Sequence, residues 1–162
     1  MIISLIACMD DNNAIGYQNK LLFKNKDDIE WFKQHTINKV CIIGRKTYES
    51  IGKPLKHRVN VVLTFDKNYN PHKDVLVYHS IDQILKDFQH EKEIMVIGGS
   101  NVYTQFLPLA DRLYLTKVHT KYEKADAFFP KYSECDWAER YFREGKNSIY
   151  PYTFHVYHKV NK

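Results

Sequence analysis

Two segments of the chain follow the same pattern, in which a short apolar run ends at glycine and a helical segment follows at once. The first run covers 40–43 and ends at Gly44, and the second covers 93–97 and ends at Gly98 and Gly99. Strands that alternate with helices in this way predict a largely parallel sheet with helices on both faces. Ligands of such sheets bind beyond the carboxyl ends of the strands, so we expect both glycine turns on one side of the sheet, beside a ligand.

The rest of the chain continues this alternation and predicts an α/β fold. We expect strands over 2–9, 40–43, 58–64, 75–78, 93–97, 112–119, 137–143 and 152–157, and helices over 27–36, 46–51, 82–89 and 101–107. Ser80 is the expected N-cap of the third helix. The last two strands form a hairpin, which adds an antiparallel edge. The segment 10–26 is polar and irregular, and we expect a functional or mobile loop there. The whole chain, 1–162, should form one domain, with a central, mostly parallel mixed sheet of about eight strands flanked by four helices.

The composition supports a packed globular protein and disfavours two classes of partner. Of the 162 residues, 44% are hydrophobic and 14% are aromatic, which is enough for a sizeable core. The net charge of +5 and the pI near 9.0 permit anionic ligands. The lysines are spread along the chain, which favours a solvated surface over a nucleic-acid patch. No apolar run approaches the roughly 20 residues of a membrane span. We therefore expect neither a nucleic acid nor a membrane as a partner.

Cysteine and histidine usage indicates a reducing compartment and no metal. The three cysteines, Cys8, Cys41 and Cys135, cannot form a complete disulfide framework. Cys8 and Cys41 lie in apolar strand-like runs, as buried thiols do. No Cys or His cluster has metal-ligand spacing. The apolar start of the chain lacks a basic region before it, so it is expected to be a retained first strand rather than a signal peptide. The expected localisation is cytoplasmic.

The residues after Gly44 suit a phosphate group. A strand that ends in glycine and opens a helix directs free backbone N–H groups at one spot, and the helix dipole favours an anion there. Arg45, Lys46 and Thr47 follow at once and add two cations and a hydroxyl. The second turn, at Gly98, is explained equally well by a backbone that needs a positive φ. Two anion sites together suit a dinucleotide, but the G-x-G-x-x-G fingerprint is absent, so a nicotinamide cofactor would bind in another manner.

Asp28 differs from an ordinary acidic residue in a first helical turn. Trp31 and Phe32 follow at i+3 and i+4, so Asp28 projects onto an apolar face, where its pKa is raised. A carboxylate there can accept two parallel hydrogen bonds from a planar amidine-like edge. For Asp27 a role at the helix dipole is the favoured interpretation. Arg58 is either a surface cation or a group that binds a ligand carboxylate, and the spacing alone does not decide between them.

Five blocks of the chain match a known protein family in their order and spacing. They are SLIACMDDNNAIG, DDIEWFKQHT, VCIIGRKTYESIGKPLKHR, EIMVIGGSNVYTQFLPLADRLYLT and ADAFFP. On these blocks the chain resembles dihydrofolate reductases nearly from end to end. The resemblance implies an oxidoreductase of class EC 1.5.1.3, which reduces 7,8-dihydrofolate to 5,6,7,8-tetrahydrofolate with NADPH as the cofactor. It further implies a role in one-carbon metabolism and thymidylate synthesis, inhibition by antifolates, and a monomer.

The resemblance also implies roles for individual residues. The catalytic group comprises Leu21, Phe23, Asp28 and Thr116. The substrate-binding residues are Ile6, Ala7, Cys8, Asp28, Ile29, Phe32, Ile51, Leu55, Arg58, Ile97 and Thr116. The cofactor-binding residues are Ala7, Ile15, Gly16, Asn19, Gly44, Arg45, Lys46, Thr47, Leu63, Thr64, Phe65, Ile97, Gly98, Gly99, Ser100, Asn101, Val102 and Tyr103. Asp28 should bind the 2-amino and N3 edge of the pterin, with Thr116 linked to its carboxylate, and Arg58 should bind the α-carboxylate of the glutamate.

The chain departs from the family pattern at a few positions. Leu22 and Phe23 stand where the family usually has Pro-Trp, and Phe23 has no indole N–H to offer an ordered water. Phe65 and Asn101 stand where a small polar and a basic residue often contribute to the cofactor site, so a preference for NADPH rests on the residues after Gly44. Ala125 occupies a site often given to glycine, so we expect a different loop motion there.

Two other functions remain open from the sequence. One is a reductase of another pyrimidine or pterin, like the riboflavin-pathway reductases of similar architecture. The other is a basic, non-catalytic nucleic-acid binder.

Overall fold

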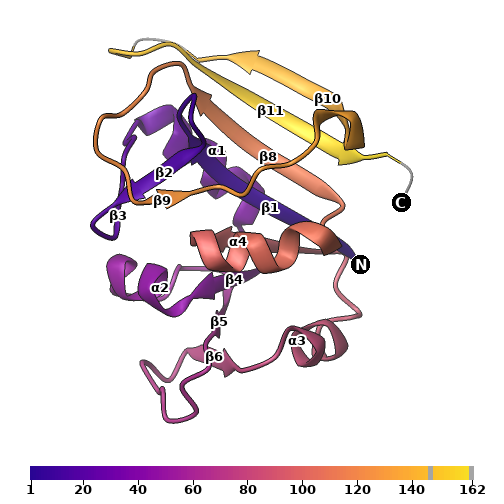
Figure 1. The fold of residues 1–162 in the computed structure, drawn as a ribbon. Helices are drawn as coiled ribbons and strands as arrows, with labels where there is room; N and C mark the ends of the chain where they lie inside the picture. Colours follow the sequence, from indigo (N-terminus) through magenta and orange to yellow (C-terminus); the bar gives the residue numbers. More distant parts are fainter. Residues whose placement is uncertain (146–147, 161–162) are drawn as a thin grey trace.

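The computed structural model describes residues 1–145 and 148–160, and a twisted eight-stranded sheet runs through it (Figure 1). The strand order in this sheet is β10-β11-β8-β1-β7-β4-β5-β6. The strands are β1 (Ile2–Met9), β4 (Val40–Gly44), β5 (Val59–Leu63), β6 (Val75–Tyr78), β7 (Glu93–Gly98), β8 (Arg112–Val118), β10 (Trp137–Glu144) and β11 (Tyr152–Lys159). All neighbouring pairs are parallel except β8 with β11 and β11 with β10. The mostly parallel sheet with an antiparallel hairpin at its edge is therefore confirmed.

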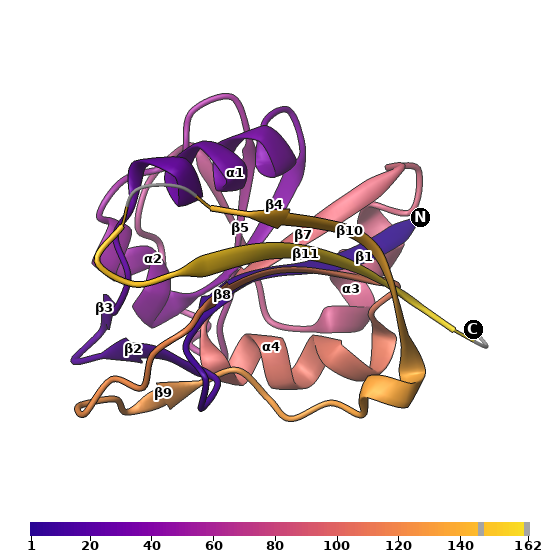
Figure 2. The same cartoon turned by 90° about the horizontal axis from the view of Figure 1, so that it is seen from above.

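Helices cover both faces of the sheet, as the alternation of strands and helices predicts. Figure 2 shows α1 and α4 on opposite faces. The α-helices of the described residues are α1 (Lys26–Thr36), α2 (Arg45–Ile51), α3 (Ile81–Asp87) and α4 (Ser100–Phe106), and short 3-10 turns follow at Leu107–Leu109 and Glu134–Asp136. Ser80 caps α3 as expected, by accepting from the backbone N–H of Gln83. None of these helices is long and apolar enough to cross a membrane.

The prediction of an irregular loop over 10–26 is wrong. That segment contains β2 (Ala14–Tyr17) and β3 (Lys20–Leu21), which form a second sheet with β9 (Ala127–Phe128), in the order β3-β2-β9. Gln18 and Asn19 connect β2 and β3. Both residues have a positive φ, as is common in two-residue hairpin turns. The strands are too short to show an alternating pattern, so the local pairing of β2 with β3 has no clear signal in the sequence. The second partner of β2, β9, lies more than a hundred residues away, and no local pattern indicates that pairing.

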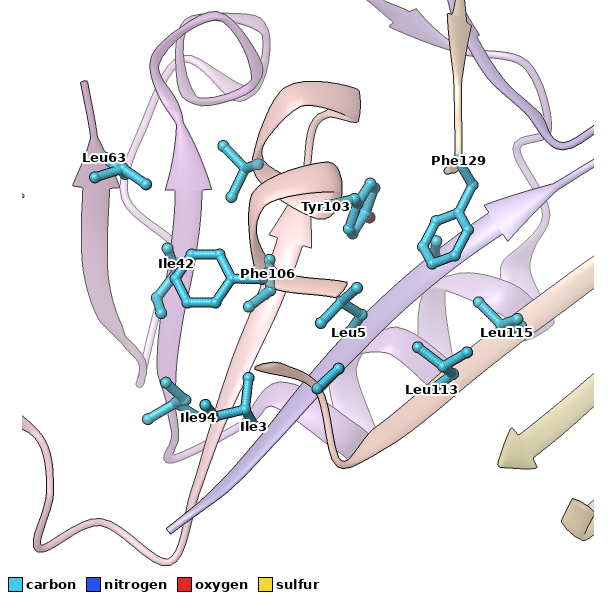
Figure 3. Packing of buried hydrophobic residues seen from close by; sticks show 14 of the residues in the cluster. Ile3, Leu5, Ile42, Leu63, Ile94, Tyr103, Phe106, Leu113, Leu115 and Phe129 are labelled. Atoms are coloured by element: carbon cyan, nitrogen blue, oxygen red, sulfur yellow. The ribbon is translucent and has the colours of Figure 1, made fainter. Parts of the chain in front are cut away.

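The core has a layer on each face of the large sheet, because successive side chains of a strand point to opposite faces. In β1, Leu5 and Ala7 belong to the cluster on the α4 face, whereas Ile6 and Cys8 belong to the cluster with Trp31 of α1. Figure 3 shows the α4 face, where Tyr103 and Phe106 are directed at the sheet among its aliphatic side chains. This alternation places Cys8 on the α1 face of the sheet.

We expect Phe106→Ala to be the most damaging kind of core substitution in this fold. The Phe106 side chain is 0% exposed and packs in the α4 cluster, so its truncation should cost about 3–5 kcal/mol of the free energy of unfolding. Urea unfolding followed by circular dichroism measures the loss. Leu76→Ala on the edge strand β6, where Leu76 is 45% exposed, should cost under ~1 kcal/mol. Equal losses in the two variants would contradict this placement of the core.

Candidate active site

The two glycine turns lie side by side, because β4 and β7 are neighbouring parallel strands. A Cβ atom added to Gly44 would lie 2.9 Å from Cγ2 of Val102 and 3.5 Å from the Gly98 oxygen. A Cβ atom added to Gly99 would lie 2.9 Å from Oγ1 of Thr47. The side chains of Val102 and Thr47 therefore occupy the space that a side chain at Gly44 or Gly99 would need. The expectation that both turns face the same side of the sheet is confirmed.

The backbone N–H groups at the starts of α2 and α4 donate to no capping side chain. Gly44 is the N-cap residue of α2 and Gly99 that of α4, and neither helix has a side-chain cap. Gly98 has φ of 126°, a conformation that glycine adopts readily, and its peptide bond to Gly99 is cis. Orphan N–H groups at a helix start can be satisfied by a ligand oxygen.

Charged side chains surround the start of α2. Arg45 is half-buried and donates to the Glu49 carboxylate over 2.8 Å, one turn further along α2. Lys46 is exposed, and its backbone carbonyl accepts from Nδ2 of Asn19 over 2.9 Å. The Ser50 hydroxyl donates to the Asn19 carbonyl over 2.6 Å. The turn between β2 and β3 is thus attached to α2, the helix that follows the glycine turn of β4.

The expected cofactor contacts fall into an exposed group and a buried group. Phe65 is 80% exposed just beyond the end of β5, and Asn101 is exposed on α4. Leu63, Val102 and Tyr103 are buried beneath the glycine turns, in the core cluster of the α4 face. The structure places these three side chains as supports of the turns.

Two expected cofactor residues of α4 have their side chains engaged within the protein. The Ser100 hydroxyl donates to the Phe128 carbonyl over 2.6 Å, which attaches α4 to β9. The Tyr103 hydroxyl donates to the Ile6 carbonyl over 2.6 Å, which attaches α4 to β1. The start of α4 is thereby fixed to both sheets.

The Asp28 carboxyl group is held in apolar surroundings beside Thr116. The Thr116 hydroxyl donates to Oδ1 of Asp28 over 2.6 Å, which is the link that the family resemblance implies. Desolvation raises the pKa of Asp28 above its ordinary value of 3.8, although the hydrogen bond from Thr116 and the nearby Cys8 thiol oppose this and the Asp27 charge adds to it. The expectation that burial raises this pKa is therefore confirmed.

An apolar cluster on the α1 face of the sheet packs against Cys8, the neighbour of Thr116 and Asp28. Ile6 and Phe23 are buried in the cluster with Trp31, and Cys8 and Ile97 pack against that cluster. Ile97 also packs against the cluster that contains Tyr48 of α2, so it stands between α1 and the glycine turn of β4. The candidate pterin and nicotinamide positions therefore share one apolar wall.

Further apolar side chains are exposed around this wall. The exposed fractions are 65% for Leu21, 64% for Ile29 and 36% for Ile51. Phe32 and Leu55 are half-buried, and Ala7, Ile15 and Gly16 are buried. Exposed apolar side chains beside a desolvated carboxyl group can bury their surface against an apolar part of a ligand.

Arg58 is aligned by the end of α1. Its guanidinium donates to the Thr36 hydroxyl over 3.1 Å and to the Lys56 carbonyl over 2.9 Å. The side chain is half-buried, so it is not a freely solvated cation. A guanidinium held in one orientation is suited to a bidentate contact with a ligand carboxylate.

The sequence analysis did not find the partners of Asp27. Arg143 donates to both oxygens of this carboxylate, over 3.0 and 3.2 Å, and the Tyr152 hydroxyl donates to it over 3.0 Å. The Arg143 guanidinium also lies 4.4 Å from the ring centre of Phe154. These partners come from β10 and β11, more than a hundred residues further along the chain, and no local signal connects them with α1. They attach the first turn of α1 to the C-terminal hairpin.

An apolar-walled carboxyl group beside uncapped glycine turns, at the carboxyl ends of parallel strands, is the site of a nucleotide-dependent α/β enzyme. Comparison with known proteins agrees. Residues 2–159 match the family model described as dihydrofolate reductase. This chain belongs to the dihydrofolate reductase family, and the expectation from its sequence is confirmed. The family membership also decides against the two alternatives that the sequence left open.

Individual relatives are similar along almost the whole chain. The dihydrofolate reductase of Staphylococcus haemolyticus is 38% identical over 161 residues, which cover 98% of this chain and 96% of that protein. The enzyme of Buchnera aphidicola subsp. Baizongia pistaciae is 40% identical over 166 residues, with 99% of both chains covered. The structure of dihydrofolate reductase from Enterococcus faecalis complexed with NADP(H) and RAB-propyl matches with a TM-score of 0.91 and 32% identity, covering 99% of this chain and 97% of that one.

We expect Asp28→Asn to stabilise the protein at neutral pH. The pKa of Asp28 is raised in the folded state, so the folded protein holds this proton to higher pH than the unfolded chain does. The carboxyl group therefore costs stability increasingly as pH rises from its unfolded pKa of about 4 through the raised folded value. Urea midpoints should be higher for Asp28→Asn than for the wild type at pH 7, and the difference should vanish near pH 3. Glu123→Gln, which alters an exposed carboxyl group, should show no such pH-dependent gain. Parallel curves for Asp28→Asn and the wild type would contradict the prediction.

Proposed function

We propose that the residues around Asp28 bind 7,8-dihydrofolate and that the two glycine turns bind NADPH, so that this site catalyses reduction to 5,6,7,8-tetrahydrofolate. The single observation that carries the proposal is the Asp28–Thr116 pair in its apolar surroundings. It lies at the carboxyl ends of β1 and β8, the same edge of the sheet at which β4 and β7 end in glycine. One site can therefore hold a flat heterocycle and a dinucleotide side by side.

The Asp28 carboxylate would bind the 2-amino group and N3 of the pterin through two parallel hydrogen bonds. Thr116 fixes one carboxylate oxygen, so the group meets the heterocycle in a set orientation. The proton for N5 of the pterin would come from water, since Asp28 is proposed to act indirectly by polarising the ring. Phe23 belongs to this apolar cluster, and its side chain has no N–H group. Ordered water there would therefore depend on other donors.

The residues of the glycine turns fit a dinucleotide. An added Cβ would fill the space at Gly44 or Gly99, and no side chain caps the helices that follow. Arg45, Lys46 and Thr47 would hold the 2′-phosphate and pyrophosphate, and Ser100 would face them from α4. When bound, NADPH supplies the hydride. The hairpin of β2 and β3, attached to α2 through Asn19, would exclude water from the reacting rings.

Arg58 would bind the α-carboxylate of the glutamate tail of the substrate. Its alignment by Thr36 supports this role over that of a solvated cation. The exposed side chains of Leu21, Ile29 and Ile51 would pack against the pterin and the benzoyl group. Antifolates with a similar planar edge would occupy the same positions.

We also infer that residues 1–162 act as one domain and as a monomer in the cytoplasm. In support, the large sheet contains strands from both ends of the chain, with β1 and β11 separated by β8 alone. The cysteines Cys8, Cys41 and Cys135 are free thiols, as suits a reducing compartment.

We expect the protein to consume NADPH, followed at 340 nm, only when dihydrofolate is present, and Asp28→Asn to lower kcat/KM by about 10²-fold or more. The loss should be smaller for substrate that is already protonated. Asp27→Asn is the matched control, because it alters the neighbouring carboxyl group that bonds to Arg143 rather than to Thr116. It should retain most of its turnover. Full activity in Asp28→Asn would overturn the proposed role of this carboxylate.

The preference for NADPH over NADH should depend on Arg45. Arg45→Met removes a cation at the proposed 2′-phosphate position and should lower kcat/KM for NADPH by about tenfold, with little change for NADH. Lys86→Met, an exposed cation on α3, should leave both values unchanged. If wild-type kcat/KM were equal for the two cofactors, the proposed phosphate contact would be wrong.

A further inference from the structure

Cys8 and Thr116 are direct neighbours in the large sheet, and both lie next to Asp28. They are partners in the parallel register of β1 and β8. Paired residues of neighbouring strands lie roughly 5 Å apart and point to the same face of the sheet. That face is the one covered by α1, because Cys8 packs with Trp31. The first turn of α1 then brings the Asp28 carboxylate over this pair of strands.

Thr116 uses only a part of the hydrogen-bonding capacity of this carboxylate. Its hydroxyl binds Oδ1 over 2.6 Å, whereas an ionised carboxylate has about four acceptor positions on its two oxygens. Cys8 is a free thiol that lies close to the same carboxylate, on the strand next to that of Thr116. A thiol is a weak donor, but a charged acceptor strengthens the bond.

The protonation state of Cys8 suits a donor. Burial, together with the nearby Asp28 carboxylate, raises the pKa of this thiol well above its ordinary value of 9.0. At neutral pH the sulfur therefore keeps its proton and can donate it to the carboxylate. A thiolate at this position would repel Asp28 instead.

Few other titratable groups face Asp28 from the elements packed around it. Asp27 on the same helix raises the pKa of Asp28, and Arg143 binds Asp27 from β10. Tyr103 of α4 is buried nearby, but its hydroxyl donates to the Ile6 carbonyl. Thr116 and Cys8 are the groups that stabilise the ionised carboxylate directly.

We propose that Cys8 is a positioning residue whose thiol donates a second hydrogen bond to Asp28 and, together with Thr116, keeps that carboxylate oriented and ionised for the substrate. Each of the two strands thereby contributes one donor at the same register position. Cys8→Ala would conserve the apolar wall but leave the Asp28 carboxylate with one donor fewer. This inference rests on the proposed function of Asp28.

The test is a ¹³C NMR titration of the Asp28 carboxyl carbon, which needs no turnover. Cys8→Ala should raise the pKa of Asp28 above the wild-type value, because a donor to the charged form is lost. Cys8→Ser should restore it toward the wild-type value, because a hydroxyl can donate in the place of the thiol. Cys41→Ala is the matched control: this buried thiol, in the same apolar cluster, contacts the Thr36 and Lys39 carbonyls and should leave the titration of Asp28 unchanged.

The pH profile of kcat/KM gives a second readout. The acid limb should move to higher pH in Cys8→Ala and return in Cys8→Ser. An unchanged Asp28 titration in Cys8→Ala, or an equal shift in Cys41→Ala, would overturn the role of Cys8. Neither result depends on the identity of the substrate, so a failure of this inference is distinguishable from a failure of the proposed function, which the NADPH assay tests.

Discussion

An ionisable carboxyl group in an apolar setting is unfavourable, and the organisation of this protein around Asp28 follows from that cost. The group lies in the first turn of α1 against a buried aromatic cluster, and burial alone would keep it neutral at a higher pH than usual. The Thr116 hydroxyl of β8 opposes this effect by donating to the carboxylate, and the Cys8 thiol of β1, which we propose as a second donor, acts in the same direction. Thr116 and Cys8 are neighbours because β1 and β8 are paired in this register. The order of the central strands is thus a requirement of the site as well as of the core.

The same edge of the sheet meets a second requirement, which is close packing of side chains against the backbone of the glycine turns. Val102 and Thr47 leave no space for side chains at Gly44 and Gly99. Buried side chains beneath them, including Val102 and Tyr103, hold α4 against the strands. The Asp28 carboxylate and the two glycine turns therefore lie at the same edge of one sheet. This arrangement would allow a small protein to orient the two proposed ligands at once.

Features that arise from short stretches of sequence could be predicted, and features that arise from distant pairing could not. The glycine turns, the Ser80 cap and the apolar setting of Asp28 each follow from residues within one or two helical turns. In the small sheet, strands of two to four residues are paired, and the pairing of β2 with β9 spans more than a hundred positions. The bonds of Asp27 to Arg143 and Tyr152 span a similar separation. A local pattern carries no information on such partners, although it shows which face of a strand a residue occupies.

The small three-stranded sheet has a mechanical consequence for the site. The Asp126 backbone N–H donates to the Gly16 carbonyl, and the Phe129 N–H donates to the Asn13 carbonyl, so β9 is joined to the segment that includes β2. Ser100 joins β9 to the first residue of α4. Any displacement of the β2–β3 hairpin away from α2 must either break this ladder or pull β9 and the start of α4 with it. The hairpin, β9 and the first turn of α4 are consequently connected parts of one frame around the site.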